Sequence, residues 1–194
     1  MRIIGGIAGG RILKVPKGLD VRPTPDLVRQ ALFNSLGARV EGAKVLELFG
    51  GTGALSLECL SRGATCAVCV EKSGRHAQYI RQNLEATGLE RSRLSIRVQD
   101  AFAVLAQMAA TGEQFDLVLA DPPYGEKNIG RRSVSFAQKM LDDPSLPRVL
   151  SPGGLFVLGH ARRDTLTVIA PWEETKLLRH GDSIMRFLTI EAAA

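Results

Sequence analysis

The sequence of 194 residues predicts an α/β fold, with a mostly parallel sheet of seven strands preceded by a small N-terminal β-hairpin and helix. Two observations lead to this prediction. From residue 44 onward, short β-prone runs alternate with segments whose apolar residues recur at helical spacing, which is typical of parallel strands joined by helices. A content of 45% hydrophobic and 23% charged residues is that of a soluble globular protein.

Each element can be placed on the sequence. Strands are expected near residues 44–49, 66–71, 93–98, 115–120, 154–159, 172–179 and 184–190, and helices near 53–62, 73–87, 101–110 and 134–142. An earlier helix is expected to start with Thr24 as its N-cap, Pro25 at its first position and Asp26 at the positive end of its dipole. We therefore expect an N-terminal extension over residues 1–42 and a main domain over residues 43–194.

A glycine-rich turn follows the first strand of the main domain. The stretch Val45 to Gly53 reads as an apolar strand with three glycines among its last four residues, and helical spacing resumes at Ala54. Glycines let the backbone turn sharply and let a ligand approach the main chain closely. The helix N-terminus beyond the turn carries a partial positive charge. The stretch therefore predicts a site for a nucleotide-like ligand.

Acidic residues mark the ends of the next predicted strands. Glu71 follows Gly51 by 20 residues, a spacing at which an acid commonly binds a ribose. The third strand ends at Asp100 and the fourth at Asp121. Because ligands of parallel α/β sheets bind at the carboxyl ends of the strands, these residues are expected to converge on one edge.

The tetrad Asp121-Pro122-Pro123-Tyr124 has the chemistry of a clamp for an exocyclic amine. Two prolines stiffen the backbone and remove two N–H donors, so the carbonyl of Pro122 is expected to be a fixed acceptor. Asp121 supplies a second acceptor, and Tyr124 supplies a ring on which a base can stack. Together they would hold both amine protons and aim the nitrogen lone pair at an electrophile.

Charge and cysteine content restrict the partners and the compartment. Residues 1–42 hold seven basic and three acidic residues, which suggests a polyanionic partner for this extension. Cys66 and Cys69 lie three apart on a predicted strand and point to opposite faces, so no metal site is expected. No apolar run approaches the ~20 residues of a membrane span, and no signal-peptide core is present, so a cytoplasmic protein is expected.

The motifs together resemble the S-adenosylmethionine-dependent amino-methyltransferases, and specifically the RsmD family. The specific resemblance rests on residues 2–6, 22–24, 31–34, 53–55 and 61–64, beside the glycine turn, the strand-end acids and the tetrad. It implies a Rossmann-like class I methyltransferase sheet. It further implies methylation of the N2 amine of a guanine in small-subunit (16S) ribosomal RNA, with ribosomal RNA or an assembling small subunit as the partner.

The resemblance also implies a role for each matching residue. Cofactor contacts are expected from Glu47, Phe49, Gly50, Gly51, Gly53, Glu71, Asp100, Ala101 and Phe102, and contacts to the target base from Asp121, Pro122 and Tyr124. RNA contacts are expected from Arg2, Arg11, Lys14, Arg22 and Thr24 in the extension, which would also act as a lid, and from Lys127, Arg131 and Arg132 after the tetrad. Three positions depart from the family pattern: Glu47 replaces Asp, Gly50 replaces a frequent Ala, and the fifth strand ends at Gly159-His160 without an acid.

Three other functions share part of this pattern. A nicotinamide-dependent oxidoreductase has the glycine turn and the ribose acid, but the third glycine of its fingerprint is missing and the tetrad has no use in hydride transfer. An amino-methyltransferase acting on adenine N6 of DNA, or on another RNA, shares the tetrad. A non-catalytic RNA-binding assembly factor needs only the basic extension.

Overall fold

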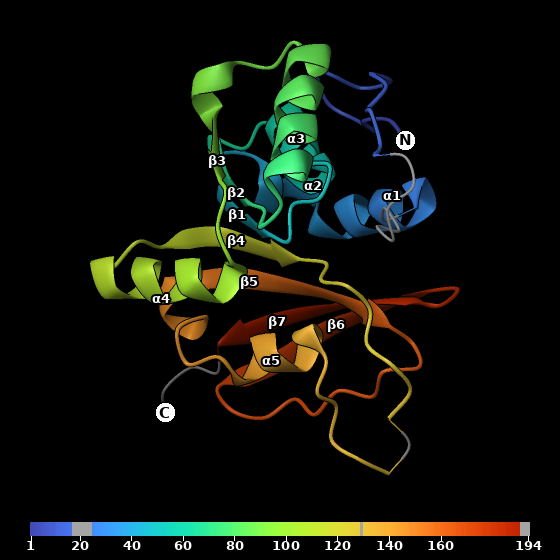
Figure 1. Cartoon of the computed structure of the whole chain (residues 1–194), viewed down its shortest axis with the longest axis vertical. Coiled ribbons are helices and arrows are strands. Elements are labelled where there is room, and N and C mark those ends of the chain that lie inside the picture. Colours follow the sequence, from blue (N-terminus) through green and yellow to red (C-terminus); the bar gives the residue numbers. More distant parts are fainter. Residues whose placement is uncertain (17–24, 129, 191–194) are drawn as a thin grey trace. The chain divides into compact units, whose positions relative to one another are not determined.

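The computed structural model describes residues 1–16, 25–128 and 130–190 of the chain. These residues form two compact units, Met1–Ala101 and Phe102–Ala194 (Figure 1). Arg22 and Thr24, for which RNA contacts and a helix cap were predicted, lie outside the described residues. The predicted division into residues 1–42 and 43–194 stays a prediction.

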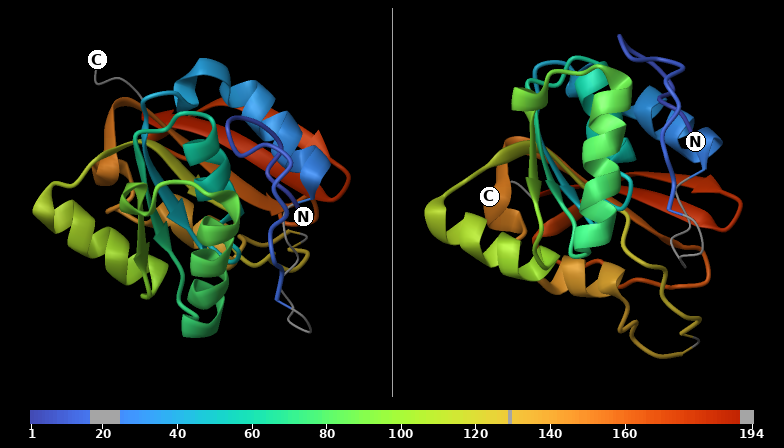
Figure 2. Two further views of the ribbon diagram at one scale, coloured as in Figure 1. Left: turned by 90° about the horizontal axis from the view of Figure 1, so that it is seen from above. Right: turned by 45° about the horizontal axis from the view of Figure 1, so that its top comes forward.

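The first unit contains three strands and the helices between them. Its elements are α1 (Asp26–Leu36), the short 3-10 helix η1 (Gly37–Val40), β1 (Lys44–Leu48), α2 (Ala54–Ser61), β2 (Cys66–Val70), α3 (Gly74–Thr87), η2 (Arg91–Arg93) and β3 (Leu94–Arg97). Strand β2 pairs in parallel with β1 on one side and with β3 on the other. Helices α2 and α3 contact each other beside these strands, and Figure 2 shows α3 alongside them in both views.

The second unit contains four strands. The chain continues through α4 (Ala101–Thr111), β4 (Phe115–Ala120), α5 (Phe136–Asp142), η3 (Pro147–Val149), β5 (Leu150–Ala161), β6 (Trp172–His180) and β7 (Ser183–Ile190). Strands β4 and β5 are parallel, whereas β7 is antiparallel to both β5 and β6. The strand order is β3-β2-β1-β4-β5-β7-β6, which confirms the predicted seven-stranded, mostly parallel sheet.

Burial explains why the central strands read as continuous apolar runs. Four of the five residues in β1 and in β2, and five of the six in β4, are buried. Parallel strands are covered on both faces, so they lack the alternation of apolar and polar residues that a half-exposed strand shows. Strand β6 is mostly exposed and carries charged residues, as expected for the strand at the end of the order.

The start of α1 differs from the prediction. The helix begins at Asp26, so Pro25 is the N-cap residue and not the first helical residue, and it makes no side-chain cap. Because proline has no N–H to donate, it also fits this position. Helices α3 and α5 do have side-chain caps, since Ser73 Oγ and Ser135 Oγ accept from the main-chain N–H of His76 and Gln138.

The N-terminal arm (residues 1–16) is less regular than the predicted hairpin. Its two runs do pair, but only Arg2 and Ile12 form an antiparallel bridge. The reason lies in the glycine-rich connection. Gly10 N–H donates to the Ile3 carbonyl at 2.9 Å, but Ala8 N–H donates to Ser61 Oγ at 2.9 Å and Ile7 N–H donates to the Ser61 carbonyl at 2.8 Å, so part of the connection bonds to α2.

Candidate functional site

The glycine turn (Phe49–Gly53) is held to β2 and adopts left-handed backbone conformations. Phe49, Gly51 and Gly53 have φ angles of 62°, 55° and 74°. Gly50 N–H donates to the Val70 carbonyl at 2.8 Å, and Gly53 N–H donates to the Gly50 carbonyl at 2.7 Å. Left-handed backbone is easily reached by glycine but strained for phenylalanine, so Phe49 marks a constrained position at the end of β1.

Gly50 is required by its neighbour on β2. A Cβ atom at this position would lie 2.3 Å from Cys69 Sγ, a distance at which one of the two residues must move. The structure thus gives a reason for the departure seen in the sequence, where glycine occupies a position at which the resembling family often has alanine. The turn and β2 approach each other more closely than a methyl group allows.

Glu47 supports the turn from inside the protein. Its side chain is buried, and Oε2 accepts the Ser56 N–H at 2.9 Å and the Cys69 thiol at 3.3 Å. Burial raises the pKa of Glu47 above its ordinary 4.5, while the hydrogen bonds from Ser56 and Cys69 act in the opposite direction. The carboxylate therefore caps the first turn of α2, as acids at helix N-termini do.

Glu71 lies against the glycine turn, as its spacing predicted. Its Oε2 accepts the Gly51 N–H at 2.7 Å, and its Oε1 accepts the Ser73 N–H at 2.7 Å. His76 Nδ1 lies 3.6 Å from Oε1. Because each carboxylate oxygen has two lone pairs, acceptor capacity remains on both oxygens.

The next strand end carries Asp100, followed by the start of α4. The Asp100 side chain is 42% exposed, and its Oδ2 lies 3.4 Å from Lys72 Nζ. Ala101 is buried, and Phe102 stacks against Phe136 with ring centroids 6.3 Å apart. An open cavity of about 430 Å³ is lined by Phe102, Phe136, Lys139, Asp142, Asp143 and Pro144. It offers an apolar wall beside Phe102, where an adenine contact was predicted.

The tetrad is positioned by β5 and β7, its neighbours in the second unit. A Cβ atom on Gly159 of β5 would lie 2.3 Å from Asp121 Oδ1, so this carboxylate occupies the space left by the absent side chain. The Tyr124 hydroxyl and Ser183 Oγ at the start of β7 are hydrogen-bonded at 2.8 Å. An acceptor and an aromatic ring, three positions apart along the chain, are thus both held in place.

The sequence showed that the fifth strand ends at Gly159-His160 without an acid, and the structure shows what these two residues do. Gly159 contributes by leaving room for Asp121. His160 is buried and bonds to Arg186 and to its own neighbour in the chain. Its Nε2 accepts from Arg186 Nε at 3.0 Å, and its Nδ1 lies 2.9 Å from the Ala161 carbonyl. Burial, together with the Arg186 charge, lowers the pKa of His160 below its ordinary 6.5. His160 is therefore a neutral structural residue.

The predicted RNA-contacting residues that the structure describes lie on the surface. Arg2, Arg11 and Lys14 are exposed on the arm, and Lys127, Arg131 and Arg132 are exposed after the tetrad. Arg132 is paired with Asp142 at 2.6 Å. The first set belongs to the first unit and the second set to the second unit.

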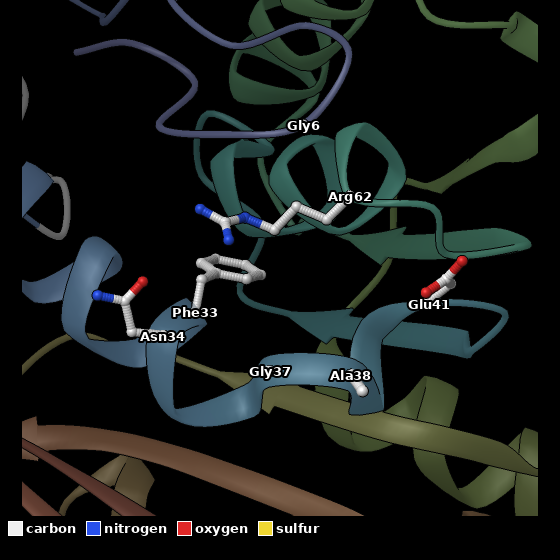
Figure 3. Close-up of a pocket in the computed structure, with 7 residues that line it drawn as sticks. All are labelled: Gly6, Phe33, Asn34, Gly37, Ala38, Glu41 and Arg62. Carbon is white, nitrogen blue, oxygen red and sulfur yellow. The ribbon is translucent and has the colours of Figure 1, made fainter.

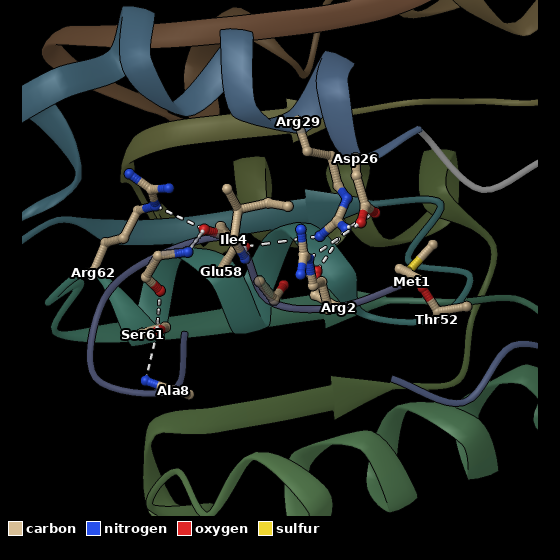
Figure 4. Close-up of polar contacts among 12 residues, drawn as sticks. Met1, Arg2, Ile4, Ala8, Asp26, Arg29, Thr52, Glu58, Ser61 and Arg62 are labelled. Atoms are coloured by element: carbon tan, nitrogen blue, oxygen red, sulfur yellow. Dashed lines mark hydrogen bonds and ion pairs between the residues drawn. The ribbon is translucent and has the colours of Figure 1, made fainter. Parts of the chain in front are cut away.

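The arm is fastened to α2 by a buried acid that the sequence did not single out (Figure 4). Glu58 is fully buried, and its two oxygens accept the main-chain N–H groups of Ile4 at 2.7 Å and Gly5 at 2.9 Å. It also binds Arg62 Nε at 2.8 Å and lies 3.7 Å from the buried Arg29. The available signal was a single charged residue in the helix Ala54–Ser61, whose other residues are apolar or serine.

A second cavity lies in the first unit, away from the glycine turn (Figure 3). It measures about 520 Å³ and is lined by Gly6, Phe33, Asn34, Gly37, Ala38, Glu41 and Arg62. The Arg62 guanidinium lies over the Phe33 ring, 5.0 Å from its centroid. Arg62 thus joins this cavity to the anchor of the arm.

The strand order and the site residues define a class of protein. The fold is that of the class I S-adenosylmethionine-dependent methyltransferases, and it is shared with solved structures. A putative methyltransferase of Escherichia coli, yhhF, is 30% identical, with a TM-score of 0.79 over 100% of this chain and 99% of that chain. A 16S rRNA N2 G1207 methyltransferase from Thermus thermophilus, solved with AdoMet and guanosine, shares the fold at a TM-score of 0.65 and 24% identity, over 88% of this chain and 44% of that chain.

The chain belongs to the family described as Conserved hypothetical protein 95, whose model matches residues 1–189. Its relatives include the ribosomal RNA small subunit methyltransferase D of Escherichia coli, 39% identical over 64% of this chain and 60% of that protein. The putative rRNA methyltransferase YlbH of Bacillus subtilis is 35% identical over 66% of this chain and 70% of that protein. The resemblance to the RsmD family seen in the sequence is thereby confirmed.

Proposed function

We propose that this protein transfers the methyl group of S-adenosylmethionine to the N2 amine of a guanine in small-subunit ribosomal RNA. The observation that carries the proposal is the immobilised tetrad: Gly159 leaves space for the Asp121 carboxylate, and Ser183 holds the Tyr124 hydroxyl. A clamp for an amine is useful only if it is rigid, because reacting atoms must be held about 3 Å apart and in line.

The first unit has the features that S-adenosylmethionine needs. Glu71 keeps acceptor capacity for the ribose hydroxyls, and the left-handed turn at Gly51 and Gly53 keeps side chains away from the main chain there. Asp100 is exposed enough to meet the adenine amine. Phe102, which follows Ala101 in the chain as the first residue of the second unit, would pack on the adenine ring. We assign the cofactor to Phe49, Gly50, Gly51, Gly53, Glu71, Asp100, Ala101 and Phe102. Glu47 supports this set by fixing α2.

The tetrad orients the attacking nitrogen. S-adenosylmethionine supplies a methyl group already activated by its sulfonium, so the protein does not need to create a strong nucleophile. Asp121 and the Pro122 carbonyl accept hydrogen bonds from the two N–H groups of the amine, while Tyr124 stacks on the base. Asp121 serves mainly as an acceptor, because the amine becomes acidic only after the methyl group has been transferred.

The substrate class is inferred from the relatives and from the basic surfaces. Two relatives carry the name of a small-subunit ribosomal RNA methyltransferase, in Escherichia coli and in Haemophilus influenzae. Residues 1–42 would bind the RNA backbone, covering the site as a lid, and residues 43–194 would carry out the transfer. The exposed Lys127, Arg131 and Arg132 would meet RNA near the flipped base. The substrate is RNA or an assembling small subunit in the cytoplasm.

The test is methyl transfer from labelled S-adenosylmethionine to small ribosomal particles that lack the modification, followed by mapping of the product nucleotide. Label in N2-methylguanine of 16S RNA is the expected result, and Asp121→Ala should abolish it. Label in 23S RNA or in DNA adenine would replace this proposal with one of its rivals. Assembly activity that survives Asp121→Ala, without any label, would indicate a non-catalytic RNA-binding factor.

A further inference from the structure

Asp164, which follows β5, is a buried carboxylate that accepts no hydrogen bond from the part of the chain that the structure describes. Its residue is 1% exposed, and among the described residues neither Oδ1 nor Oδ2 has a hydrogen-bond partner. Its main chain is ordered by a turn in which Asp164 N–H donates to the Ala161 carbonyl at 3.0 Å. Buried polar atoms are nearly always satisfied, and a buried carboxylate is costly when it is not. Its two oxygens are therefore available to a ligand donor.

The Asp164 carboxylate lies beside the tetrad, within the same unit. A Cβ atom on Gly125 would lie 2.6 Å from Asp164 Oδ2, so the carboxylate packs on the main chain of the residue that follows Tyr124. Ala120 and Leu158 are partners in the pairing of β4 with β5, and Asp121 packs on Gly159 directly beyond them. The carboxylates of Asp121 and Asp164 thus both follow the carboxyl ends of these paired strands.

Gly125 packs against Asp164, and the segment that follows it, residues 126–128 and 130–132, is held to the turn after β5 by exposed hydrogen bonds. Arg163 Nε donates to the Gly125 carbonyl at 3.2 Å. The Asn128 side chain donates to the Thr165 carbonyl at 2.9 Å and accepts from the Thr165 N–H at 2.8 Å. All three hydrogen bonds are solvent-exposed, and the segment carries the basic residues assigned above to RNA. RNA bound to this segment can therefore draw it away from Asp164.

We propose that Asp164 is a specificity-determining residue, which accepts a hydrogen bond from N1–H of the guanine whose N2 amine is held by Asp121 and Pro122. The inference rests on the proposed function. Guanine presents N1–H next to its N2 amine, whereas adenine presents a lone pair at N1 next to its N6 amine. A carboxylate at this point attracts N1–H of guanine and repels the N1 lone pair of adenine. The tetrad alone cannot make that distinction, because it accepts from any exocyclic amine.

The chemical test uses 2-aminopurine, which keeps the 2-amine of guanine and has a lone pair at N1. Once the target nucleotide is mapped, particles carrying guanine or 2-aminopurine at that position are compared as substrates. The wild-type protein should prefer guanine by at least ~100-fold, as sites that bind a substrate N–H reject analogues that lack it. In Asp164→Asn the amide can donate to N1 of 2-aminopurine, so the preference should fall to about tenfold or less.

Asp116→Asn is the matched control, since Asp116 is an exposed acid at the other end of β4, bound to Ser151 Oγ at 2.8 Å. It should keep the wild-type preference. Asp164→Asn should unfold at the same temperature as the wild type or higher, because it replaces a buried carboxylate that has no hydrogen-bond donor among the described residues.

An unchanged preference in Asp164→Asn overturns the inference alone, and a lowered melting temperature beside it would indicate a purely structural carboxylate. Absence of guanine methylation by the wild-type protein overturns the proposed function, and this inference with it.

Discussion

The side chain of Asn83 on α3 joins the arm residue Lys14 to the glycine turn. Asn83 Oδ1 accepts the Lys14 N–H at 2.7 Å, and Asn83 Nδ2 donates to the carbonyls of Lys14 at 3.0 Å and Thr52 at 2.9 Å. Asn83 is fully buried. One amide thus ties the segment assigned to RNA binding to the turn assigned to the cofactor.

Asn83→Ala is therefore expected to weaken both segments. Unpaired main-chain groups at Lys14 and Thr52 should lower the free energy of unfolding by about 1–3 kcal/mol. The affinity for S-adenosylhomocysteine, measured by calorimetry, should fall about 3- to 10-fold as the turn loosens. Gln82→Ala is the control. Gln82 is exposed, and its Oε1 accepts a hydrogen bond at 3.3 Å from the side chain of Lys14, at Nζ. Equal affinities in the two variants would contradict the coupling.

Removal of the Glu58 carboxylate should release the arm. Glu58→Ala removes the acceptor of the Ile4 and Gly5 N–H groups and one of the two acids beside the buried Arg29, whose other acid, Asp26, lies at 2.6 Å. Each donor left without an acceptor costs about 1–3 kcal/mol. Chemical unfolding should show that loss, and limited proteolysis should cut the arm faster. Glu85→Ala removes an exposed ion pair with Arg91 and should cost at most about 1 kcal/mol. Similar losses in the two variants would argue against an anchoring role for Glu58.

The contact between Gly50 and Cys69 predicts a rescue. Gly50→Ala alone should destabilise the protein by about 1–3 kcal/mol, as overpacking does, and weaken cofactor binding. Cys69→Ala removes the sulfur that the new methyl group meets. The double variant should therefore be more stable than the sum of the two single changes predicts, by at least about 0.5 kcal/mol. Strictly additive losses in urea unfolding would disprove this steric account.

Gly159→Ala should disable the tetrad with little effect on the cofactor. The added methyl group must displace the Asp121 carboxylate, and a misplacement of about 1 Å in a catalytic group can cost about 100-fold in rate. The rate of methyl transfer should fall by that factor while the affinity for S-adenosylhomocysteine stays unchanged. Gly74→Ala is the control, because no atom lies within 4 Å of a Cβ there. Full activity of Gly159→Ala would show that the position of Asp121 is unimportant.

His160 predicts a loss of stability in mild acid. The pKa of His160 is lowered in the folded protein, by burial first and then by Arg186, so below about pH 6.5 the unfolded chain takes up a proton that the folded chain resists. The free energy of unfolding should therefore fall as the pH drops from 6.5, by at most about 1.4 kcal/mol per pH unit from this residue. His160→Gln should flatten the slope, and parallel wild-type and variant curves between pH 5 and 7 would refute the assignment.

The sequence was most informative where local pattern and spacing decide the outcome. Continuous apolar runs located the parallel strands, and the 20 residues between Gly51 and Glu71 placed that acid at the glycine turn, 2.7 Å from Gly51 N. The Asp121 tetrad could be recognised because its chemistry is contained within four consecutive residues.

Contacts between distant segments could not be predicted from the sequence. The need for Gly50 depends on how closely β2 approaches the turn, and the role of His160 depends on Arg186 of β7. Glu58, Asn83 and Asp164 each act on a segment far along the chain. The predicted hairpin was too regular for a related reason: its glycine-rich connection bonds to Ser61, 53 residues beyond Ala8.

The anchor at Glu58 recognises only peptide N–H groups, those of Ile4 and Gly5, which every non-proline residue possesses. These two hydrogen bonds place no demand on the Ile4 side chain, although docking of the arm still requires glycine at position 6, where a Cβ atom would lie 1.9 Å from the Ser61 carbonyl oxygen, and the buried side chains of Ile3 and Leu13. Exchanging the exposed Arg2 and Arg11 should therefore change the binding of RNA while the anchor at Glu58 keeps its hydrogen bonds.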